Sequence, residues 1–573
     1  MAKTVMPTRR RVVFLSLVFI VFTAAVTVRL FALQVLGHSY FRNLAENQQQ
    51  LYKDLIPERG KIFIHTGQNG EELIEIVGNI QKDLVYAVPP EIIDKEKTAK
   101  LLSPLLEIGS SEILAKISQD ERKWVALKKQ LPESVSLDIE KLDLPGIYFQ
   151  PEDYRFHPEK NLASQVLGFL AYEGEKRTGQ YGVERYYEEI LAGTPGSLLQ
   201  EEDASGGWIT GGARKLEPAV PGGDIVLTIN RVIQFQAESI LSETVRENEA
   251  DSGSVVVLDP KTGAVLALAN YPDFDPNTFN EVEDPKRFRN PAVTDAYEPG
   301  SVFKPFTMAA ALDSGAIAPE DTFEDRGSVQ VNDRVIKNAN EKTFGIQTIT
   351  QILEQSINTG AVFLQQKAGK ENFLGTIEKF GFGKQTGLTL PFESRGDLRN
   401  LIGGADIDYA TASFGQGITV TPLQLAQGYA AIANQGKMTK PYIAESIRTR
   451  DGTIQIKPEE VREAVSSKTA NIVSAMLVSV VENGHGKRAR VPGYYIAGKT
   501  GTAQVAREGA LGYDPDLSIG TFAGFGPIED PKFVIVVKID NPKTVRFAES
   551  TAAPAFGELA KFLLDYFQIR PTR

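Results

Sequence analysis

An uncharged run near the N-terminus, residues 12–28 (VVFLSLVFIVFTAAVTV), constrains the architecture of this chain most strongly. As a helix rising about 1.5 Å per residue, it would span about 26 Å. The apolar extension at 30–36 and snorkelling by Arg11 and Arg29 would cover the ~30 Å hydrocarbon core of a bilayer. The run exceeds the ~7–15 residues of a signal-peptide core, which favours a retained anchor over a cleaved signal. We expect residues 12–36 to form one transmembrane helix.

The charges beside this run predict its orientation. Basic residues stand before it at positions 3, 9, 10 and 11, and such basic flanks are retained on the cytoplasmic side of a membrane. We therefore expect residues 1–11 to be a cytoplasmic tail and the chain after about residue 37 to lie outside the cytoplasm. No later segment is as long without charge, so the sequence predicts a single-pass protein with a large extracytoplasmic body.

The composition excludes several kinds of chemistry. The 573 residues contain no cysteine, which removes disulfides, thiolate metal sites, iron–sulfur clusters and cysteine nucleophiles. The four histidines, at positions 38, 65, 157 and 485, form no short metal-binding motif, so we expect no metal and no cofactor. The net charge of −11 gives no footprint for nucleic acid. Catalysis must therefore use Ser, Thr, Lys, Asn, Asp or Glu.

Patterning divides the body after the anchor into two parts. Residues 37–215 are loop-rich and charged, with strand-like runs at 61–64 and 73–77 and a helical, Lys/Glu-rich insertion at about 91–129. Glycine, proline and charged residues concentrate in 201–223, as in a linker between folding units. The second part is expected to cover residues 216–573.

The second part alternates strands and helices. Its expected elements are a strand at 225–229, a helix at 231–248, strands at 254–258 and 264–269, a hairpin of strands at 518–524 and 533–539, and a final helix at 555–567. The turn Asp-Pro-Lys-Thr-Gly at 259–263 makes the first strand pair a hairpin as well. Strands at both ends with helices between them predict an α/β (α+β) sandwich with a largely antiparallel sheet.

The heptapeptide EPGSVFK, residues 298–304, is the first of three motifs with chemical potential. Its proline and glycine would end any helix or strand that precedes them. Ser301 is therefore expected at a helix N-terminus, with Lys304 three residues later on the same face of the helix. Lysine can activate a serine only when neutral, and lowering its pKa from ~10.4 to ~7.5 costs about 4 kcal/mol. Burial and a second nearby cation are the available means. Taken alone, the motif is more simply a capping serine and a surface lysine.

The second motif is Ser356-Ile357-Asn358. Its hydroxyl could relay protons, and its amide could both donate to and accept from a peptide substrate. Asn358 is expected to interrupt the helical pattern of residues 348–355, so a turn or helix-capping asparagine is the simpler explanation of the tripeptide by itself.

The third motif, Gly498-Lys499-Thr500-Gly501-Thr502, lies on a strand predicted for residues 494–505. Lys499 could be the second cation that lowers the pKa of Lys304. The two threonine hydroxyls could bind a carboxylate, and Gly501 lets a substrate backbone come close. A Lys-Thr-Gly tripeptide is weak evidence by itself, because a second copy at 261–263 lies in a predicted hairpin turn.

Together and in this order, the three motifs resemble the S-x-x-K, S-x-N and K-T-G boxes of the penicillin-binding proteins. The flanking sequences EPGSVFKPFT, SFGQGITVTPLQLA and AGKTGTAQ agree with that family. Earlier in the chain, PERGKIF, YRFHPEKNLASQVLGF and GQYGVERYYEEILAGTPG resemble the pedestal of class B members. Two departures are small: Val302 stands where threonine is common, and His65-Thr66 stands where Asp-Arg is common. The resemblance covers nearly the whole chain.

The resemblance implies a role for each motif residue. It implies that Ser301 is the acyl-accepting nucleophile and Lys304 its general base, while Ser356 and Asn358 form a cleft wall and assist proton transfer. It implies that the terminal carboxylate of the substrate is bound by Lys499, Thr500 and Thr502, with Gly501 among them. The implied oxyanion hole consists of the backbone N–H groups of Ser301 and Thr502. The implied reaction is D,D-transpeptidation, which joins peptidoglycan stem peptides through a serine acyl-enzyme and is inhibited by β-lactams.

The resemblance also implies an architecture and partners. The fold would be an elongated, β-rich, dimerisation-type pedestal over 37–215, followed by a transpeptidase domain like that of the serine β-lactamases, with a central antiparallel sheet flanked by helices. The protein would lie in the bacterial cytoplasmic (inner) membrane with its catalytic domain in the periplasm. Its partners would be stem peptides, β-lactam antibiotics, a SEDS-type lipid II polymerase and other proteins of a division or elongation complex, and no nucleic acid. The compact C-terminus and residues 413–426 favour the septal over the side-wall type.

Other functions fit parts of the sequence. Residues 493–500 match the phosphate-loop pattern G-x-x-x-x-G-K-[ST], but bulky, strand-like residues within them and glycines after them leave no long helix to follow. A D,D-carboxypeptidase or a β-lactamase-like hydrolase would use the same three boxes, although no feature identifies a glutamate-activated water. A non-catalytic scaffold of a cell-wall synthesis complex is the alternative from another class, and it predicts that replacing Ser301 is tolerated.

Overall fold

The computed structural model describes residues 8–36, 50–68, 72–174, 176–201, 214–507 and 512–573. The chain divides into two compact units. One consists of residues 1–58 and 193–222, and the other of residues 59–192 and 223–573.

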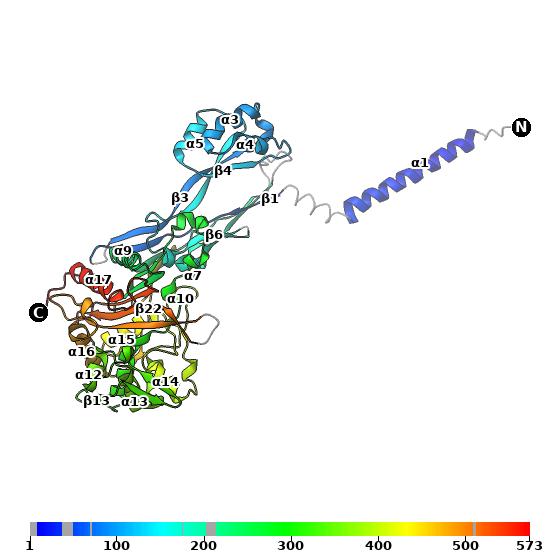
Figure 1. Ribbon diagram of the computed structural model, residues 1–573. Helices are drawn as coiled ribbons and strands as arrows, with labels where there is room; N and C mark the ends of the chain where they lie inside the picture. Colours follow the sequence, from blue (N-terminus) through cyan, green and yellow to red (C-terminus); the bar gives the residue numbers. More distant parts are fainter. Residues whose placement is uncertain (1–7, 37–49, 69–71, 175, 202–213, 508–511) are drawn as a thin grey trace. The chain divides into compact units, whose positions relative to one another are not determined.

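The first unit contains the N-terminal helix α1, Thr8–Phe31, and a π-helical turn that continues it, Ala32–Leu36 (Figure 1). Val12–Val35 has a mean hydropathy of 2.4, and within the described ranges it is the one helix long and apolar enough to cross a membrane. It is therefore a candidate membrane anchor.

A small antiparallel sheet completes the first unit. Its strands, in spatial order, are β1 (Gln50–Leu55), β8 (Gly196–Glu201) and β9 (Arg214–Glu217). The linker predicted for 201–223 is wrong at β9, because these residues pair with β8 as a regular strand. Residues 202–213 of the predicted linker lie outside the described residues.

The second unit begins with a seven-stranded sheet. Six strands follow the order β19-β18-β10-β2-β3-β4, and β5 also pairs with β3. Their bounds are β2 (Ile62–Thr66), β3 (Glu72–Ala87), β4 (Val125–Leu131), β5 (Ile147–Phe156), β10 (Asp224–Asn230), β18 (Ala444–Thr449) and β19 (Gly452–Gln455). The strands predicted at 61–64, 73–77 and 225–229 are confirmed as parts of β2, β3 and β10.

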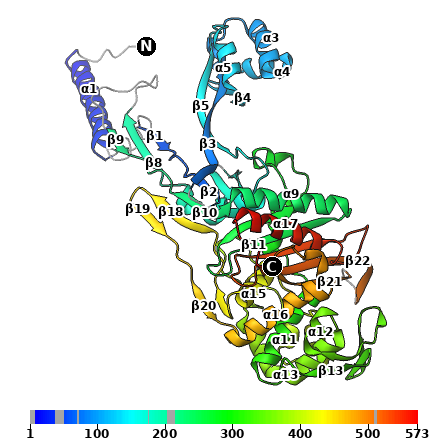
Figure 2. The same ribbon diagram turned by 90° about the vertical axis from the view of Figure 1, so that its left-hand side faces the viewer.

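Helices α3 (Lys95–Leu106), α4 (Ser110–Ile117) and α5 (Glu133–Glu140) pack against β3, β4 and β5 around an apolar core of their own (Figure 2). The helical insertion predicted for about 91–129 is correct over α3 and α4 and wrong at its end, where β4 begins. In β4 (VALKKQL), Val125, Leu127 and Leu131 are buried while the lysines between them are not, so this segment has the two-residue period of a strand. The sequence predicts a helix here because the segment is rich in lysine.

A buried ion cluster ties distant parts of this region together. Glu184, in the short helix α7 (Gly182–Tyr186), has no exposed surface. One of its oxygens accepts a hydrogen bond from Arg155 Nε at 2.6 Å, and the other accepts one from Arg59 at 2.6 Å. Arg59 also pairs with Glu188, the first residue of α8 (Glu188–Leu191). The cluster joins β5 to the segment before β2. Each of its charges is compensated by the others, so the loss of one leaves an uncompensated charge in the interior.

A five-stranded antiparallel sheet organises the rest of the unit. Its strands, in spatial order, are β12 (Val265–Tyr271), β11 (Ser252–Leu258), β23 (Phe533–Asp540), β22 (Tyr513–Gly526) and β21 (Ala497–Ala506). Both predicted hairpins are confirmed, because β11 pairs with β12 and β22 with β23. The expected antiparallel sheet is likewise confirmed.

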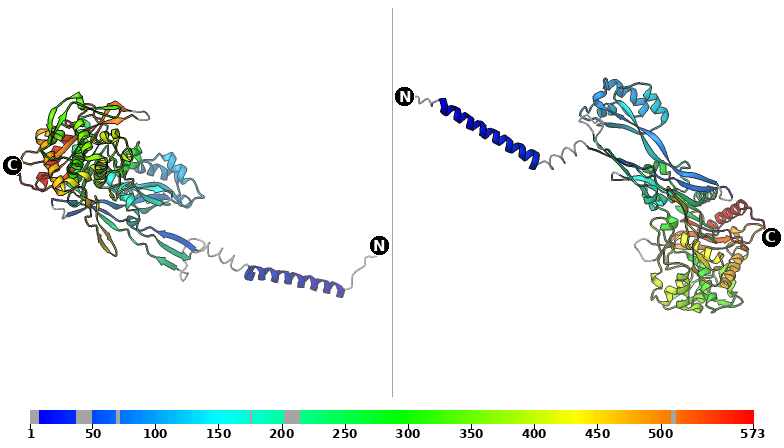
Figure 3. Two further views of the ribbon diagram at one scale, coloured as in Figure 1. Left: turned by 90° about the horizontal axis from the view of Figure 1, so that it is seen from below. Right: turned by 180° about the vertical axis from the view of Figure 1, so that it is seen from behind.

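Helices cover both faces of this sheet. α9 (Arg231–Glu247) and the C-terminal helix α17 (Ala552–Tyr566), red in Figure 3, pack on one face. The other face carries α15 (Pro422–Ala433) and the larger hydrophobic core of the unit. The helices predicted at 231–248 and 555–567 are α9 and α17 within a few residues.

The remaining helices and short strands form an α-rich region beside this core. The helices are α11 (Lys304–Asp313), α12 (Ile349–Glu354), α13 (Asn358–Lys379), α14 (Asp406–Ala412) and α16 (Ser467–Asn483). The strands are β13 (Thr322–Asp325), β14 (Ser328–Val331), β15 (Arg334–Lys337), β16 (Gly345–Thr348), β17 (Lys437–Thr439) and β20 (Glu460–Glu463). The remaining short elements are α6 (Ser164–Leu167), β6 (Phe169–Glu173), β7 (Lys176–Gln180) and α10 (Pro291–Thr294), of which α10 packs against β11, β12 and α15.

The ion cluster predicts a large effect of one substitution. Replacing Glu184 by glutamine leaves Arg155 without an ion-pair partner within the described residues and leaves Arg59 with Glu188 alone. We expect a loss of about 3–5 kcal/mol in the free energy of unfolding of this region. Thermal unfolding followed by circular dichroism measures the loss. Glu217→Gln is the control, because Glu217 forms an exposed ion pair with Lys215 and its loss should cost at most about 1 kcal/mol. Equal stability of the two variants would contradict the prediction.

Candidate active site

The first motif begins a helix, as its sequence predicts. Residues 300–303 form a 3₁₀ turn that leads directly into α11, so Ser301 lies at the start of the helical segment and Lys304 is the first residue of α11. Gly300 has φ +60°, in the left-handed region that favours glycine. The side chain of Ser301 makes no hydrogen bond to any residue of the described ranges.

Strand β21 lies tightly against this turn. A Cβ atom on Gly501 would come within 2.9 Å of the Pro299 carbonyl oxygen and of the Val302 backbone nitrogen, so only glycine allows the contact. The sequence predicts that Gly501 lets a substrate backbone come close to the strand. In the structure its lack of a side chain admits the protein's own serine-bearing turn, which brings the third motif beside the first.

Two lysine side chains are fully buried at this contact. Lys304 Nζ donates to Asn358 Oδ1 at 2.8 Å, to the Ser356 carbonyl oxygen at 2.5 Å and to Ser356 Oγ at 3.2 Å. Lys499 Nζ donates to the same Ser356 Oγ at 3.1 Å and to the Thr500 carbonyl oxygen at 3.0 Å. One serine hydroxyl thus lies between the two amines, and neither amine forms an ion pair within the described part of the chain.

This environment favours the neutral form of both amines. Burial, with the neighbouring Lys499 second, holds the pKa of Lys304 well below its ordinary value. Burial lowers the pKa of Lys499 to about 7, although Glu549 opposes the shift. Burial and a second cation are the two causes that the sequence analysis named for Lys304. A neutral amine can accept the proton of a neighbouring hydroxyl.

The second motif connects two helices. Ser356 follows the end of α12 with φ +54°, in the left-handed region, and Asn358 is the first residue of α13. The helical stretch predicted for 348–355 is confirmed as α12, which ends at Glu354, but the predicted helix-ending role of Asn358 is wrong, since Asn358 begins α13. This position aims its side chain at the Lys304 amine, and its amide nitrogen donates to the Lys337 carbonyl oxygen at 3.1 Å.

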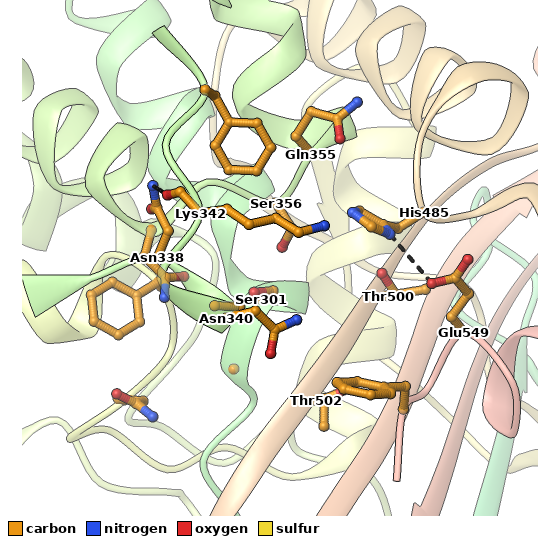
Figure 4. A pocket seen from close by; sticks show the side chains of 17 residues that line it. Ser301, Asn338, Asn340, Lys342, Gln355, Ser356, His485, Thr500, Thr502 and Glu549 are labelled. Carbon is orange, nitrogen blue, oxygen red and sulfur yellow. Dashed lines mark hydrogen bonds and ion pairs between the residues drawn. The ribbon is translucent and has the colours of Figure 1, made fainter. Parts of the chain in front are cut away.

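The three motifs meet at a cleft of about 300 Å³ (Figure 4). Of the residues predicted for the site, Ser301, Ser356, Asn358, Thr500 and Thr502 line it, while the two buried lysines lie behind its wall. Thr502 Oγ1 accepts a hydrogen bond from the Ala548 backbone at 3.1 Å, which holds the segment after β23 against the cleft. Within the described residues, no cluster of three or more His, Asp or Glu could hold a metal ion.

A buried carboxylate, Asp325, fixes the wall opposite β21. It accepts hydrogen bonds from Thr359 Oγ1 at 2.6 Å, from Asn338 Nδ2 at 2.9 Å, and from the backbone N–H groups of Gly327 at 3.0 Å and Phe344 at 2.7 Å. Two of these partners, Asn338 and Phe344, line the cleft, and Thr359 follows Asn358 directly. The carboxylate therefore holds the cleft wall and the start of α13 in one arrangement.

The sequence patterns do not identify this carboxylate or three ionisable residues of the cleft, Lys342, His485 and Glu549. None belongs to a short motif, and the contact between His485 and Glu549 joins residues 64 positions apart. The sequence offers one signal, for His485: histidine is scarce in this chain, and one of its four histidines stands 14 residues before Lys499 of the third motif.

Two family models match the chain. The model described as "Penicillin binding protein transpeptidase domain" matches residues 253–561. The model described as "Penicillin-binding Protein dimerisation domain" matches residues 54–227. All the residues placed at the cleft above lie within the first match.

Individual proteins match over almost the whole chain. Stage V sporulation protein D of Bacillus subtilis is 31% identical over 576 residues, which are 99% of this chain and 87% of that protein. The peptidoglycan D,D-transpeptidase FtsI homolog of Mesostigma viride is 31% identical over 98% of this chain and 96% of that protein. The crystal structure of penicillin binding protein 3 from Mycobacterium tuberculosis, complexed with aztreonam, is similar with a TM-score of 0.70 and 27% identity, over 91% of this chain and 98% of that one.

The lowered pKa of Lys499 predicts how stability changes with pH. Between pH 7 and the ordinary lysine value of 10.5, the unfolded chain binds a proton at Lys499 that the folded chain does not. Stability should therefore rise with pH across this window, by up to about 1.4 kcal/mol per pH unit for this group. Lys499→Met should flatten the rise, as measured by urea unfolding near both ends of the window.

The control for this experiment is Lys468→Met. Lys468 is exposed, so its surroundings change little on unfolding and its loss should leave the wild-type slope. A Lys499→Met protein with the wild-type slope would show that Lys499 keeps its proton in the folded state.

Proposed function

The chain belongs to the class B penicillin-binding proteins, the peptidoglycan D,D-transpeptidases, and we propose that it joins stem peptides through an acyl-enzyme formed on Ser301. The observation that carries the proposal is the meeting of two buried amines at the Ser356 hydroxyl, beside a serine side chain that no described residue engages. A structural role alone gives no reason to bury two like charges together.

Acylation follows from this arrangement. Lys304 in its neutral form accepts the proton of the Ser301 hydroxyl, and Oγ attacks the carbonyl carbon of the D-Ala-D-Ala bond. The backbone N–H groups of Ser301 and Thr502 stabilise the negative oxygen of the tetrahedral intermediate. When the C–N bond breaks, the proton passes to the departing amine of D-Ala through Ser356, which contacts both lysines, and Asn358 keeps Lys304 in place.

Substrate orientation is assigned to the third motif. Lys499 and the hydroxyls of Thr500 and Thr502 bind the terminal carboxylate of the stem peptide or of a β-lactam. All three residues lie on β21, and both threonines line the cleft. The acyl group then passes to an amine of a neighbouring stem peptide, which completes the cross-link.

The proposal includes the setting of the enzyme. Residues 1–11 form a cytoplasmic tail, residues 12–36 an anchor in the cytoplasmic membrane, residues 37–215 the pedestal, and residues 216–573 the transpeptidase domain outside the cytoplasm. The apolar helix and the two family matches support this division. Family resemblance supports a SEDS-type lipid II polymerase as the partner of the anchor and pedestal.

Covalent labelling tests the proposed nucleophile. A fluorescent β-lactam should label the wild-type protein, and Ser301→Ala should remove the label completely because no acyl-enzyme can form. Gel fluorescence measures both. Ser314→Ala is the matched control, since Ser314 follows the other end of α11 and its hydroxyl bonds only to the Ala311 carbonyl oxygen. Labelling that survives Ser301→Ala would overturn the assignment, and a wild type that never labels would favour the scaffold function.

The site of action is expected to be the septum. Relatives named as an FtsI homolog and as a sporulation protein support this over side-wall synthesis. A fluorescent fusion of the full chain in growing cells should concentrate at midcell, as measured by microscopy. Uniform fluorescence along the side wall would assign the protein to elongation instead.

A further inference from the structure

Two ionisable side chains on one wall of the cleft have no part in the acylation chemistry. His485 Nδ1 lies 3.3 Å from Glu549 Oε2, and the side chains are 41% and 45% exposed (Figure 4). Both line the cleft, together with Ser356 and Thr500. The other ring nitrogen of His485 makes no hydrogen bond within the described part of the chain, so it is available to a molecule in the cleft.

The backbone fixes this pair to the catalytic elements. The His485 backbone N–H donates to the carbonyl oxygen of Glu354, the last residue of α12, two positions before Ser356. Gly484 permits the contact, because a Cβ there would lie 2.5 Å from the same oxygen. Glu549 follows Ala548, whose N–H donates to Thr502 Oγ1. The pair thus joins the proton-relaying serine to the strand assigned to the substrate carboxylate.

In the second half of the proposed reaction, transfer of the acyl group to an amine, one proton must be removed that has no counterpart in acylation. Near neutral pH the attacking amine arrives as an ammonium, R–NH₃⁺, and must lose one proton before its nitrogen can attack. It loses a second proton when the new C–N bond forms and the ester C–Oγ bond breaks. That second proton can return to Ser301 Oγ through Lys304 and Ser356. The first needs a separate acceptor.

We propose that His485, oriented by Glu549, takes this first proton, and that Glu549 attracts the ammonium group of the acceptor to the cleft. The proposal rests on the proposed function and adds the residues of its acceptor step. Imidazole is the side chain best suited to exchange protons near neutral pH, and a carboxylate on one ring nitrogen leaves the other free to accept. The imidazolium then releases its proton to solvent through its exposed edge.

The other charged groups near the cleft are less suited to this role. Lys304 is buried and is already assigned the second proton, and Lys499 is buried against Thr500 and Ser356. Lys342, on the opposite wall, carries a charge that repels an ammonium. The carboxylate of Glu354 accepts a hydrogen bond from Ser479 on α16, so it is engaged away from the acceptor.

The test separates the two halves of the reaction. A thioester of an acyl-D-alanine acylates the full-length enzyme, and the acyl group is then shared between water and an added amine such as D-alanine. The measured quantity is the ratio of aminolysis to hydrolysis, at pH values below and above the pKa of the amine. His485→Gln should lower this ratio at least about tenfold at the lower pH. The deficit should vanish at the higher pH, where the amine arrives without the extra proton.

Two further variants sharpen the result. Glu549→Gln should lower the ratio in the same direction, whereas Lys487→Gln, which removes an exposed charge close to His485 in sequence but outside the cleft lining, should keep the wild-type ratio. The fluorescent β-lactam labels each variant as a check of folding and of Ser301. A normal ratio for His485→Gln at the lower pH, or a deficit equal at both, would overturn the proposal. Loss of labelling by the wild type would instead contradict the proposed function itself.

Discussion

The catalytic region depends on the burial of two lysine amines around a single serine hydroxyl. Within the described residues no carboxylate forms an ion pair with either amine, so Lys304 and Lys499 are held by neutral acceptors, namely carbonyl oxygens, Ser356 Oγ and Asn358 Oδ1. Burying two charged amines costs free energy, so folding is favoured only when protons are released from them. The surrounding elements must hold the two amines in place. The five-stranded sheet supplies one lysine, α11 the other, and the α12–α13 connection the hydroxyl between them.

Close backbone contacts bring the five-stranded sheet, α11 and the α12–α13 connection together. Gly501 lets β21 touch the turn that carries Ser301, and Gly484 lets the end of α16 touch the end of α12. Behind the opposite wall, Asp325 accepts hydrogen bonds from donors up to 34 residues further along the chain. The site is therefore precise because small residues and one buried carboxylate define its spacing.

The sequence predicted those features that depend on neighbouring residues. The hairpin of β11 and β12, the helix start at Ser301 and the strand of Lys499 follow from local patterns, and the three motifs together indicated the family and the site. Predictions failed where tertiary contacts decide. Lysines in β4 looked helical because their burial alternation is visible only in the sheet, and Asn358 looked like a helix end although α13 begins there. The contact between His485 and Glu549, 64 residues apart, has no local signal at all.

The left-handed backbone at Ser356 has a consequence for the evolution of the protein. This conformation costs residues other than glycine about 1–2 kcal/mol. Glycine would relieve the strain but would remove the hydroxyl that both lysines contact. Under the proposed function, selection for stability and selection for activity therefore favour different residues at this position.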